Sequence, residues 1–436
     1  MRERDRGALY DVDTADRAIL ALLDPPSAEE AEWAAAELRE LAASAGTVVV
    51  GEFHQRRSRP DPSYLIGHGK AEALYEEVQD RKATVVIAGQ DLTPTQQRNL
   101  EDTVLVRVID RTQLILDIFA QRAHTKEGKL QVELAQLSYL LPRLTGRGVE
   151  MTRLGGGVGT RGPGETKLEV DRRRIRARIT DLEEELREVV QRRGVQRQAR
   201  RKLPFPSAAL VGYTSAGKST LLNTLSGSDV LVDTRLFATL DPTTRRVVLP
   251  DGWAVLMSDT VGFIRDLPHH LVAAFRATLE EVTEADFLVH VVDAGHSQMR
   301  RQMEAVIQVL SELGAADKPL VTVFNKSDLF SDQYELRRLV AETPNSAYIS
   351  AKNREGILHL MDRLNSTIKS LLVRVILEIP YDRSDLVSAC YESGRVISAD
   401  YRSDRIIVVA DVAGDVAAKL DKYRVDTGCS GESGSV

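Results

Sequence analysis

The fold of the central part of this chain is decided by the stretch SAALVGYTSAGKS, residues 207–219. Its first five residues are small or apolar and predict a buried strand. The remainder matches the GxxxxGK[ST] phosphate-loop pattern, with a helix expected from Thr220. In that context the loop N–H groups surround phosphates, Lys218 reaches the β- and γ-phosphates, and the Ser219 hydroxyl binds Mg²⁺. The stretch therefore predicts an α/β nucleotide-binding domain.

A second segment needed for nucleotide hydrolysis is Asp-Thr-Val-Gly at residues 259–262, directly after a predicted strand. Asp259 is expected to hold the outer shell of the magnesium ion, and the Gly262 N–H to contact the γ-phosphate. Ras-type GTPases place a water-orienting glutamine next, but this chain has Phe263. We expect catalysis to rest on Mg²⁺, Lys218 and the backbone, and to stay slow until a partner contributes.

Selection of guanine is indicated by Asn-Lys-Ser-Asp at residues 325–328, which follows a predicted strand at residues 320–324. A carboxylate at Asp328 accepts both the N1–H and the exocyclic N–H₂ of guanine, a donor pair that adenine lacks. Ser-Ala-Lys at residues 350–352 is expected to close the base pocket. These segments, in this order and each behind a predicted strand, predict binding of GTP rather than ATP.

Two regions precede the nucleotide domain. Up to residue 111, apolar runs alternate with helix-like stretches and predict a small parallel α/β domain, with strands at residues 47–50, 84–87 and 104–106. An earlier strand over residues 17–23 reads as poorly defined, because two prolines follow it closely. Over residues 112–203, leucines spaced by three and four residues predict two helices that pack as an antiparallel coiled-coil hairpin.

Positive charge gathers in this predicted hairpin. Its glycine-rich tip, residues 145–167, is expected to be mobile alone, and its second helix has twelve Lys or Arg and five Asp or Glu over residues 172–202. That is a net charge of +7 in a chain whose total is -6. A local basic patch indicates contact with a polyanion, while a solvated helix face and a flexible linker remain open. The arginines expected to contact RNA are Arg147, Arg153, Arg161, Arg172, Arg173 and Arg174.

Composition restricts the class of protein. The 436 residues are 43% hydrophobic and 28% charged, as in soluble globular proteins with several domains. Two cysteines exclude a disulfide framework and a Cys-rich zinc site, and no apolar run is long enough to span a membrane, so a cytoplasmic protein is expected.

The predicted domains are residues 1–111, 112–203, 204–372 (the nucleotide domain) and 373–425 (a small α+β module), followed by a disordered tail at 426–436.

Six sequence words together resemble the HflX GTPases of the Obg–HflX branch of translation-associated P-loop GTPases. The resemblance covers roughly residues 47–352. Two positions depart from the family pattern: Ser215 stands in place of asparagine, which bears on potassium stimulation, and Lys167 stands in place of glutamine. The words are Gly67–Lys70, Asp91–Leu100, Asp110–Thr112, Gly159–Thr166, Thr239–Thr243 and Asp259–Phe263.

The resemblance implies a GTP-dependent factor that binds the large (50S) ribosomal subunit and its rRNA. It implies that the glycine-rich tip is pushed toward the peptidyl-transferase centre and that stalled or idle ribosomes are split. It also implies that Thr239 is the magnesium ligand of the first switch, a choice that the residues alone leave open among Thr239, Thr243 and Thr244. We expect a monomer.

Two other functions stay open, a GTPase for assembly of the large subunit and a GTP-gated RNA-binding regulatory module. ATP use by the amino-terminal domain is a minor option, because no second phosphate-loop motif occurs there. The predicted catalytic residues are Lys218, Thr239 and Gly262, and the predicted metal site consists of Ser219 and Thr239 with Asp259 in the outer shell. The predicted GTP-binding set is Gly212, Tyr213, Thr214, Ser215, Ala216, Gly217, Lys218, Ser219, Thr220, Phe237, Ala238, Thr239, Leu240, Asp241, Asp259, Thr260, Val261, Gly262, Asn325, Lys326, Ser327, Asp328, Ser350, Ala351 and Lys352.

Overall fold

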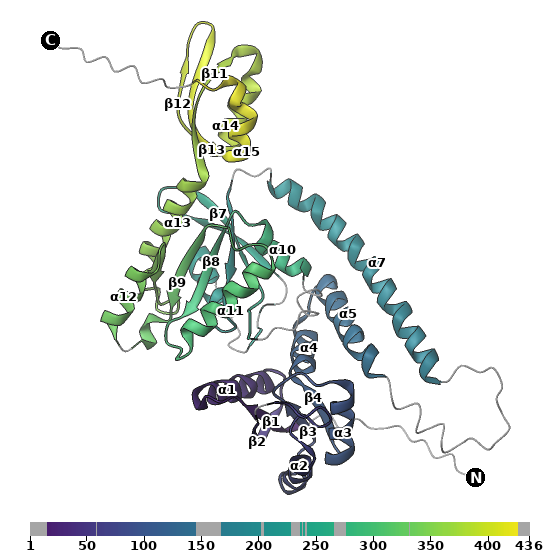
Figure 1. Cartoon of the computed structure of the whole chain (residues 1–436). Coiled ribbons are helices and arrows are strands. Elements are labelled where there is room, and N and C mark those ends of the chain that lie inside the picture. Colours follow the sequence, from purple (N-terminus) through teal and green to yellow (C-terminus); the bar gives the residue numbers. More distant parts are fainter. Residues whose placement is uncertain are drawn as a thin grey trace, which may run out of the picture. The chain divides into compact units, whose positions relative to one another are not determined.

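The chain folds into two compact units, seen here in a computed structural model (Figure 1). Within the described residues, unit 1 contains residues 15–186 together with 236, 237 and 239, and unit 2 contains the others. The division falls inside one long helix, α7 (Lys167–Arg201). The structure describes residues 15–57, 59–144, 167–201, 205–227, 236–237, 239, 242–265, 276–330 and 332–425.

Unit 1 is built on a parallel sheet of four strands in the order β2-β1-β3-β4. The prediction that the first strand is poorly defined was wrong, because β1 lies between β2 and β3 and residues 18–23 are buried. Its unbroken apolar run is what a parallel strand covered on both faces requires. The elements are β1 (Arg17–Asp24), α1 (Ala28–Ser44), β2 (Val48–Arg56), α2 (His68–Arg81), β3 (Val85–Ala88), α3 (Pro94–Val104), β4 (Arg107–Asp110), α4 (Arg111–Arg122) and α5 (Lys126–Arg143).

The limits of α3 correct a second prediction. A capping box starts this helix, in which the Thr93 hydroxyl accepts from the Gln96 N–H at 3.2 Å and the Gln96 side chain accepts from the Thr93 N–H at 2.9 Å. The helix ends at Val104, where Leu105 adopts a left-handed φ of 56°. The strand predicted at residues 104–106 therefore begins at Arg107, since the caps override the strand preference of those residues.

Between β4 and β5, every element in the described residues is a helix, as predicted. The α5 helix and the first part of α7 run antiparallel, because Glu133 pairs with Arg178 at 2.8 Å and Lys126 contacts Glu185 at 4.0 Å. The predicted tip lies almost wholly at residues 145–166, outside the described residues. Packing of the two helices as a coiled coil stays a prediction.

Unit 2 contains a sheet of six strands in the order β10-β9-β8-β5-β7-β6, with only β6 antiparallel to its neighbour (Figure 1). Because five strands are parallel, the loops after them open at one edge of the sheet, where ligands bind in such folds. The elements are β5 (Ser207–Val211), α8 (Lys218–Ser226), β6 (Thr243–Val248), β7 (Ala254–Asp259), α10 (Arg276–Glu284), β8 (Phe287–Asp293), α11 (Met299–Glu312), β9 (Leu320–Asn325), α12 (Gln333–Glu342), β10 (Ser346–Tyr348) and α13 (Ile357–Leu371).

The last part of unit 2 is a small α+β module, as predicted. Its three antiparallel strands are ordered β11-β13-β12, and two helices share a core with them that includes the buried thiol of Cys390. The second helix starts at Gly414, directly after the strand that ends at Ala413. No helix in the described ranges has the length and apolar composition needed to cross a membrane. The elements are β11 (Leu372–Pro380), α14 (Ser384–Ser393), β12 (Gly394–Tyr401), β13 (Arg405–Ala413) and α15 (Gly414–Leu420).

Candidate nucleotide site

The phosphate loop, residues 212–219, joins β5 to α8 and depends on two glycines. Gly212 has φ +154° and Gly217 has φ +96°, conformations that side chains disfavour. A Cβ on Gly212 would lie 2.2 Å from the carbonyl oxygen of Val291, and one on Gly217 would lie 2.3 Å from Asn325 Nδ2. The helix begins at Lys218, two residues before its predicted start, so its first N–H groups border the loop and suit an anion.

Lys218 is buried beneath this loop, with 6% of its surface exposed. Its Nζ donates to the carbonyl oxygens of Gly212 at 3.0 Å and Tyr213 at 2.9 Å. Burial lowers the pKa of Lys218 to about 8, an effect that the charge of Asp259 partly offsets. A phosphate placed near Nζ would supply the anionic partner that favours the charged lysine.

Ser219 and Asp259 form a pair suited to a magnesium ion. The Ser219 hydroxyl donates to Asp259 Oδ2 at 2.6 Å, and Asp259 ends β7 with 2% exposure. Because the hydroxyl proton points to the carboxylate, the lone pairs of Ser219 Oγ are left for a cation. Mg²⁺ accepts such oxygen ligands together with phosphate oxygens and water. The described ranges contain no cluster of three or more His, Cys, Asp or Glu that could hold a metal.

The second switch begins at Gly262 and lies directly against the phosphate loop. A Cβ on Gly262 would be 2.8 Å from Thr214 Cγ2 and 3.1 Å from Lys218 Nζ. The side chain of Phe263 is buried, with 1% exposed, so its ring belongs to the core. The ring offers no hydrogen bond to orient a water molecule. Hydrolysis must rely on other groups, as the sequence predicts.

Asn325 connects three loops of the site. Its Nδ2 donates to the carbonyl oxygen of Ala216 in the phosphate loop at 2.8 Å, and its Oδ1 accepts from the N–H of Ala351 at 3.0 Å. Asn325 itself ends β9 and is buried. The structure therefore brings together the phosphate loop and the two segments predicted to hold the base.

The rest of the base segment is held by the strand ends around it. Lys326 has a left-handed φ of 61°, and its Nζ forms an ion pair with Asp293 Oδ2 at 2.6 Å. The N–H of Ser327 donates to the carbonyl oxygen of Ile349 at 3.0 Å. Asp328 is exposed at the loop surface, where a base can reach its carboxylate. Asp293 was not predicted from the sequence as a site residue. Its position at the end of β8, at the same edge of the sheet as the other site residues, could have indicated it.

His290 was also missed. It lies in β8 and is 2% exposed. Burial lowers its pKa to about 4, and the charge of Lys218 acts in the same direction. The imidazole is therefore neutral near pH 7 and contributes to the sheet beneath the lysine. An isolated histidine within an apolar strand gives no sequence signal for this position.

Of the first-switch residues in the predicted GTP-binding set, 237–241, only Phe237 and Thr239 are within the described residues, and the other two candidate threonines, Thr243 and Thr244, lie in β6. The segment packs in unit 1, where the N–H of Leu236 donates to Ser44 Oγ at 3.0 Å. The ring of Phe237 meets the ring of Phe119 edge-on, with centroids 4.7 Å apart. Thr239 is assigned to unit 1, whereas Ser219 and Asp259 belong to unit 2, and its role as a metal ligand stays a prediction.

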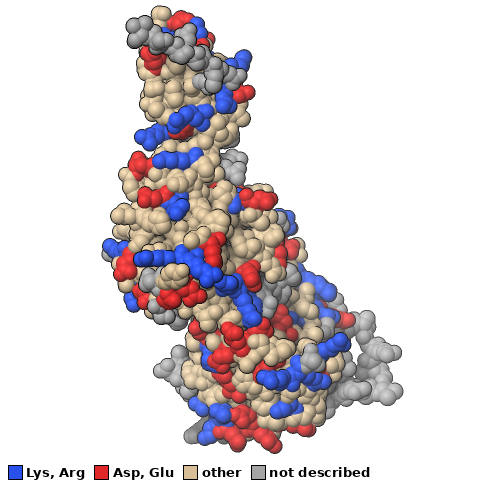
Figure 2. Space-filling model, turned by 60° about the vertical axis from the view of Figure 1, so that its left-hand side comes forward, with Lys and Arg blue, Asp and Glu red and all other residues tan. Residues whose placement is uncertain are grey.

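The arginines predicted to contact RNA are only partly described. Arg172 is half-buried, whereas Arg173 and Arg174 are exposed on α7. Arg178 is paired with Glu133 and Glu185, so the basic helix is neutralised in part. On the face shown in Figure 2, Lys and Arg side chains are interspersed with Asp and Glu. Arg147, Arg153 and Arg161 lie outside the described residues.

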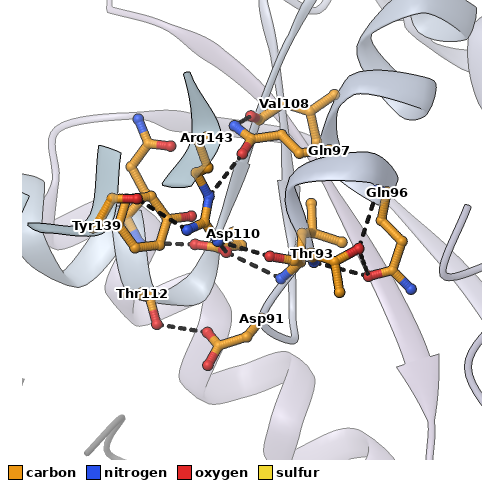
Figure 3. Close-up of polar contacts among 11 residues, drawn as sticks. Asp91, Thr93, Gln96, Gln97, Val108, Asp110, Thr112, Tyr139 and Arg143 are labelled. Atoms are coloured by element: carbon orange, nitrogen blue, oxygen red, sulfur yellow. Dashed lines mark hydrogen bonds and ion pairs between the residues drawn. The ribbon is translucent and has the colours of Figure 1, made fainter. Parts of the chain in front are cut away.

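A second polar cluster lies in unit 1, around Asp110 at the end of β4 (Figure 3). Its buried carboxylate accepts from the N–H of Leu92 at 3.0 Å, the N–H of Gln113 at 2.9 Å and Arg143 Nη2 at 3.1 Å. Burial raises the pKa of Asp110, against these hydrogen bonds and the charge of Arg143. We call Asp110 and these partners the Asp110 cluster.

Arg143 attaches α5 to this cluster. Its guanidinium also donates to the carbonyl oxygen of Leu92 at 2.7 Å and to Gln97 Oε1 at 3.1 Å, and it stacks 3.4 Å from the ring centroid of Tyr139. Nearby, the Thr112 hydroxyl donates to Asp91 Oδ1 at 2.6 Å. Two of the sequence words used above, residues 91–100 and 110–112, thus have a structural role.

Three family descriptions match the chain in succession. "GTP-binding GTPase N-terminal" matches residues 32–120, "GTP-binding GTPase Middle Region" matches residues 122–200, and "50S ribosome-binding GTPase" matches residues 207–326.

Full-length relatives match as well. A protein named GTPase HflX from Caldanaerobacter subterraneus subsp. tengcongensis is 47% identical over 409 residues, which is 94% of each chain. GTPase HflX of Escherichia coli (strain K12) is 44% identical over 357 residues, covering 82% of this chain and 84% of the relative. A solved GTP-binding protein from Sulfolobus solfataricus in complex with GDP is 25% identical, covers 82% of this chain and 99% of that one, and has a TM-score of 0.43.

Proposed function

This chain belongs to the HflX family and is a GTPase, and on that premise we propose that it acts on the large (50S) ribosomal subunit to split stalled or idle ribosomes. The observation that carries this proposal is that the description "50S ribosome-binding GTPase" matches residues 207–326, which contain the phosphate loop, Asp259 and Asn325. GTP binding drives the chain into its splitting state, and hydrolysis releases it.

The phosphates of GTP bind along the phosphate loop and the second switch. Lys218 exchanges its two carbonyl partners for the β- and γ-phosphates, and the backbone N–H of Gly262 meets the γ-phosphate. The base lies between residues 325–328 and 350–352, with Asp328 selecting guanine. Support for this placement comes from Asn325, which bonds both the phosphate loop and Ala351.

Magnesium is the cofactor of this site. When bound, it would supply positive charge that offsets the negative charge developing during phosphoryl transfer. Ser219 would hold it directly, with Asp259 in the outer shell, an assignment that the Ser219–Asp259 hydrogen bond supports. Thr239 is the proposed second protein ligand. The chain's own part is to place Lys218 and the Gly262 N–H around the γ-phosphate.

Intrinsic hydrolysis is slow in this proposal. Phe263 is buried, so no side chain at that position orients the attacking water. A partner particle is expected to raise the rate strongly by ordering the switches or supplying a missing group. Equal rates with and without ribosomes or their subunits would contradict this part of the proposal.

Contact with ribosomal RNA is assigned to the basic region of α7 and the segment before it. Arg173 and Arg174 are exposed there, as a phosphate contact requires. Arg147, Arg153 and Arg161 are assigned to the same contact from the sequence alone. The proposed setting is the cytoplasm, with the chain acting as a monomer.

Sedimentation with purified 70S particles separates the candidate functions. The particles are incubated with the protein and GTP, a non-hydrolysable GTP analogue or GDP, and then resolved on a gradient. Release of subunits with the analogue but not with GDP is expected. Binding only to immature large particles would favour an assembly factor, and binding to RNA without release would favour a regulatory module.

The arginines provide a matched test of the RNA contact. Replacing Arg153 and Arg161 with Ala is expected to leave GTP affinity unchanged and to weaken subunit release. The control replaces Arg338 with Ala, an exposed arginine of α12 that pairs only locally with Glu342 at 2.7 Å. Equal release by both variants would remove the tip arginines from the proposal.

Base selection has its own test. Asp328→Asn converts the acceptor of two guanine N–H groups into a mixed donor and acceptor, so preference should move from guanine toward xanthine nucleotides. Affinities for GTP and xanthosine triphosphate are measured side by side by fluorescence competition. A variant that keeps the original selectivity would show that Asp328 does not read the base.

A further inference from the structure

The start of the second switch is tied to the phosphate loop by a set of hydrogen bonds that we call the clamp. The N–H of Thr214 donates to the carbonyl oxygen of Phe263 at 2.7 Å, and the N–H of Phe263 donates to the carbonyl oxygen of Gly212 at 3.1 Å. Two residues further on, the N–H of Arg265 donates to the phenol oxygen of Tyr213 at 2.8 Å. At Phe263 the clamp thus consists of backbone–backbone hydrogen bonds, and at Arg265 it is a bond from the backbone to a side chain.

The clamp lies beyond a break in the register between β5 and β7. Leu210 is paired with Asp259, 49 residues on, whereas Tyr213 is paired with Phe263, 50 residues on. The hydroxyl of Thr260 donates to the carbonyl oxygen of Leu210 at 2.6 Å across this break. The ladder is thus interrupted just before the second switch, and the contacts of residues 262–265 depend on the clamp rather than on continuous pairing.

The clamp determines where the backbone of Gly262 lies. A Cβ on Gly262 would be 2.9 Å from Thr214 Cα and 3.1 Å from Lys218 Nζ, so the glycine has little freedom to shift toward the loop. Tyr213, which donates nothing to Gly262 directly, is 5% exposed and lies under the same segment. Loss of the phenol oxygen would remove the hydrogen bond that it forms with the backbone at Arg265, two residues after Phe263.

We infer that Tyr213 is a positioning residue for GTP hydrolysis, whose phenol oxygen holds the second switch so that the Gly262 N–H faces the γ-phosphate. The inference rests on the placement of GTP proposed above. Ras-type GTPases have a glutamine after this glycine, but this chain has Phe263. The inference therefore gives Tyr213, a residue of the phosphate loop, a part in ordering the second switch. Phe263 is buried and hydrogen-bonded through its backbone, which fixes the start of the segment 263–265. The Tyr213 phenol fixes its end at Arg265.

The test is the conservative variant Tyr213→Phe, which keeps the ring and removes the phenol oxygen that accepts from the Arg265 N–H. Single-turnover hydrolysis is measured with protein in excess over GTP and Mg²⁺, and affinity is measured with a fluorescent GDP analogue. We expect the hydrolysis rate constant to fall about five- to tenfold, as for the loss of one well-placed hydrogen bond. We expect GDP affinity to stay within about twofold, because the predicted contact of Tyr213 with the phosphates is made by the loop backbone, which the variant keeps.

Tyr381→Phe is the matched control. The Tyr381 hydroxyl also makes one hydrogen bond to the backbone, donating to the carbonyl oxygen of Arg402 at 2.7 Å, but within the carboxyl-terminal module. Tyr213 is buried whereas Tyr381 is exposed, so a merely structural role for Tyr213 would lower the melting temperature more in Tyr213→Phe, with no change in hydrolysis well below that temperature. A positioning role lowers hydrolysis in Tyr213→Phe alone.

Hydrogen exchange supplies a second measurement on the same variants. The amide of Arg265 should exchange faster in Tyr213→Phe than in the original protein, while the amide of Phe263 keeps its protection. Unchanged hydrolysis with normal GDP binding in Tyr213→Phe would overturn the inference, as would loss of affinity in step with loss of rate. Failure of the unaltered protein to bind GTP would instead overturn the proposed placement of the nucleotide.

Discussion

Two parallel sheets of this chain end in aspartates that serve opposite purposes. Asp110 ends β4 of unit 1, and Asp259 ends β7 of unit 2. After Asp110 a helix begins at once, and the carboxylate caps it by accepting from the N–H of Gln113, besides binding Arg143 of α5. The strand beside Asp259 is followed by a glycine-containing loop with left-handed residues. In unit 1 the aspartate at the carboxyl end of a strand thus fixes a helix. In unit 2 the corresponding edge of the sheet is where the nucleotide is proposed to bind.

The difference lies in what the connecting chain allows. A helix that starts directly after a strand uses its polar groups on its own cap. A loop with φ values that favour glycine turns its N–H groups outward instead. The Asp110 cluster should therefore matter for stability, and the phosphate loop for activity.

Arg143→Leu should give the largest effect, a loss of about 3–5 kcal/mol in the free energy of unfolding of unit 1, because Asp110 would stay buried without its cation. Urea unfolding followed by circular dichroism measures it. GTP hydrolysis measured well below the unfolding midpoint should stay unchanged. Arg178→Leu, which breaks the more exposed pair with Glu133, is the control and should cause no measurable loss. Similar losses in both variants would show that burial does not distinguish the two pairs.

Lys218→Ala should do the reverse, lowering single-turnover GTP hydrolysis at least hundredfold, or about 2.7 kcal/mol, with the melting temperature retained. The reason is that the buried lysine bonds only to loop carbonyls until a phosphate arrives. Single-turnover hydrolysis assays and differential scanning calorimetry on the same preparation provide both readings. Hydrolysis within tenfold of the unaltered rate would place the lysine outside the site.

His290 should produce the smallest effect, visible only at acid pH. Its pKa is lowered to about 4 in the folded chain, so the unfolded chain binds more protons between pH 4 and 6.5. Stability is therefore lost as the pH falls through that window and regained above it. His290→Gln should reduce the loss between pH 7 and pH 5 by on the order of 1 kcal/mol in urea unfolding. Parallel losses in both proteins would mean that another group titrates.

Much of the nucleotide site can be predicted from the sequence because its short motifs each require a particular backbone geometry. A phosphate loop needs glycine at two positions, and each remaining word must follow a strand so that it reaches the same edge. The predicted loop, Asp259, Asn325 and Ala351 accordingly meet in the structure. Roles that act through bound GTP or Mg²⁺ remain proposals.

Other features gave no local signal. Arg143 finds Asp110 across 33 residues, and neither lies in a periodic pattern that points to the other. The β1 strand was underrated because prolines near its end were weighed above its apolar run. The α3 boundary was misplaced because a capping box eleven residues earlier outweighs the strand preference of Val104. The Arg143–Asp110 pair depends on a partner distant in sequence, whereas the limits of β1 and α3 depend on local features of those elements.

The contact between Gly217 and Asn325 has a consequence for how such a site changes over generations. No side chain fits at Gly217 while the Asn325 amide stands 2.3 Å from where its Cβ would be, and Asn325 in turn holds the loop and Ala351. A side chain at Gly217 would disturb Asn325, and loss of Asn325 would remove its bonds to the loop and to Ala351, so we expect substitutions at the two positions to occur together. Asp328 is exposed and outside this lock. A lineage that drifts toward another base is therefore expected to change Asp328 first and the Gly217–Asn325 pair last.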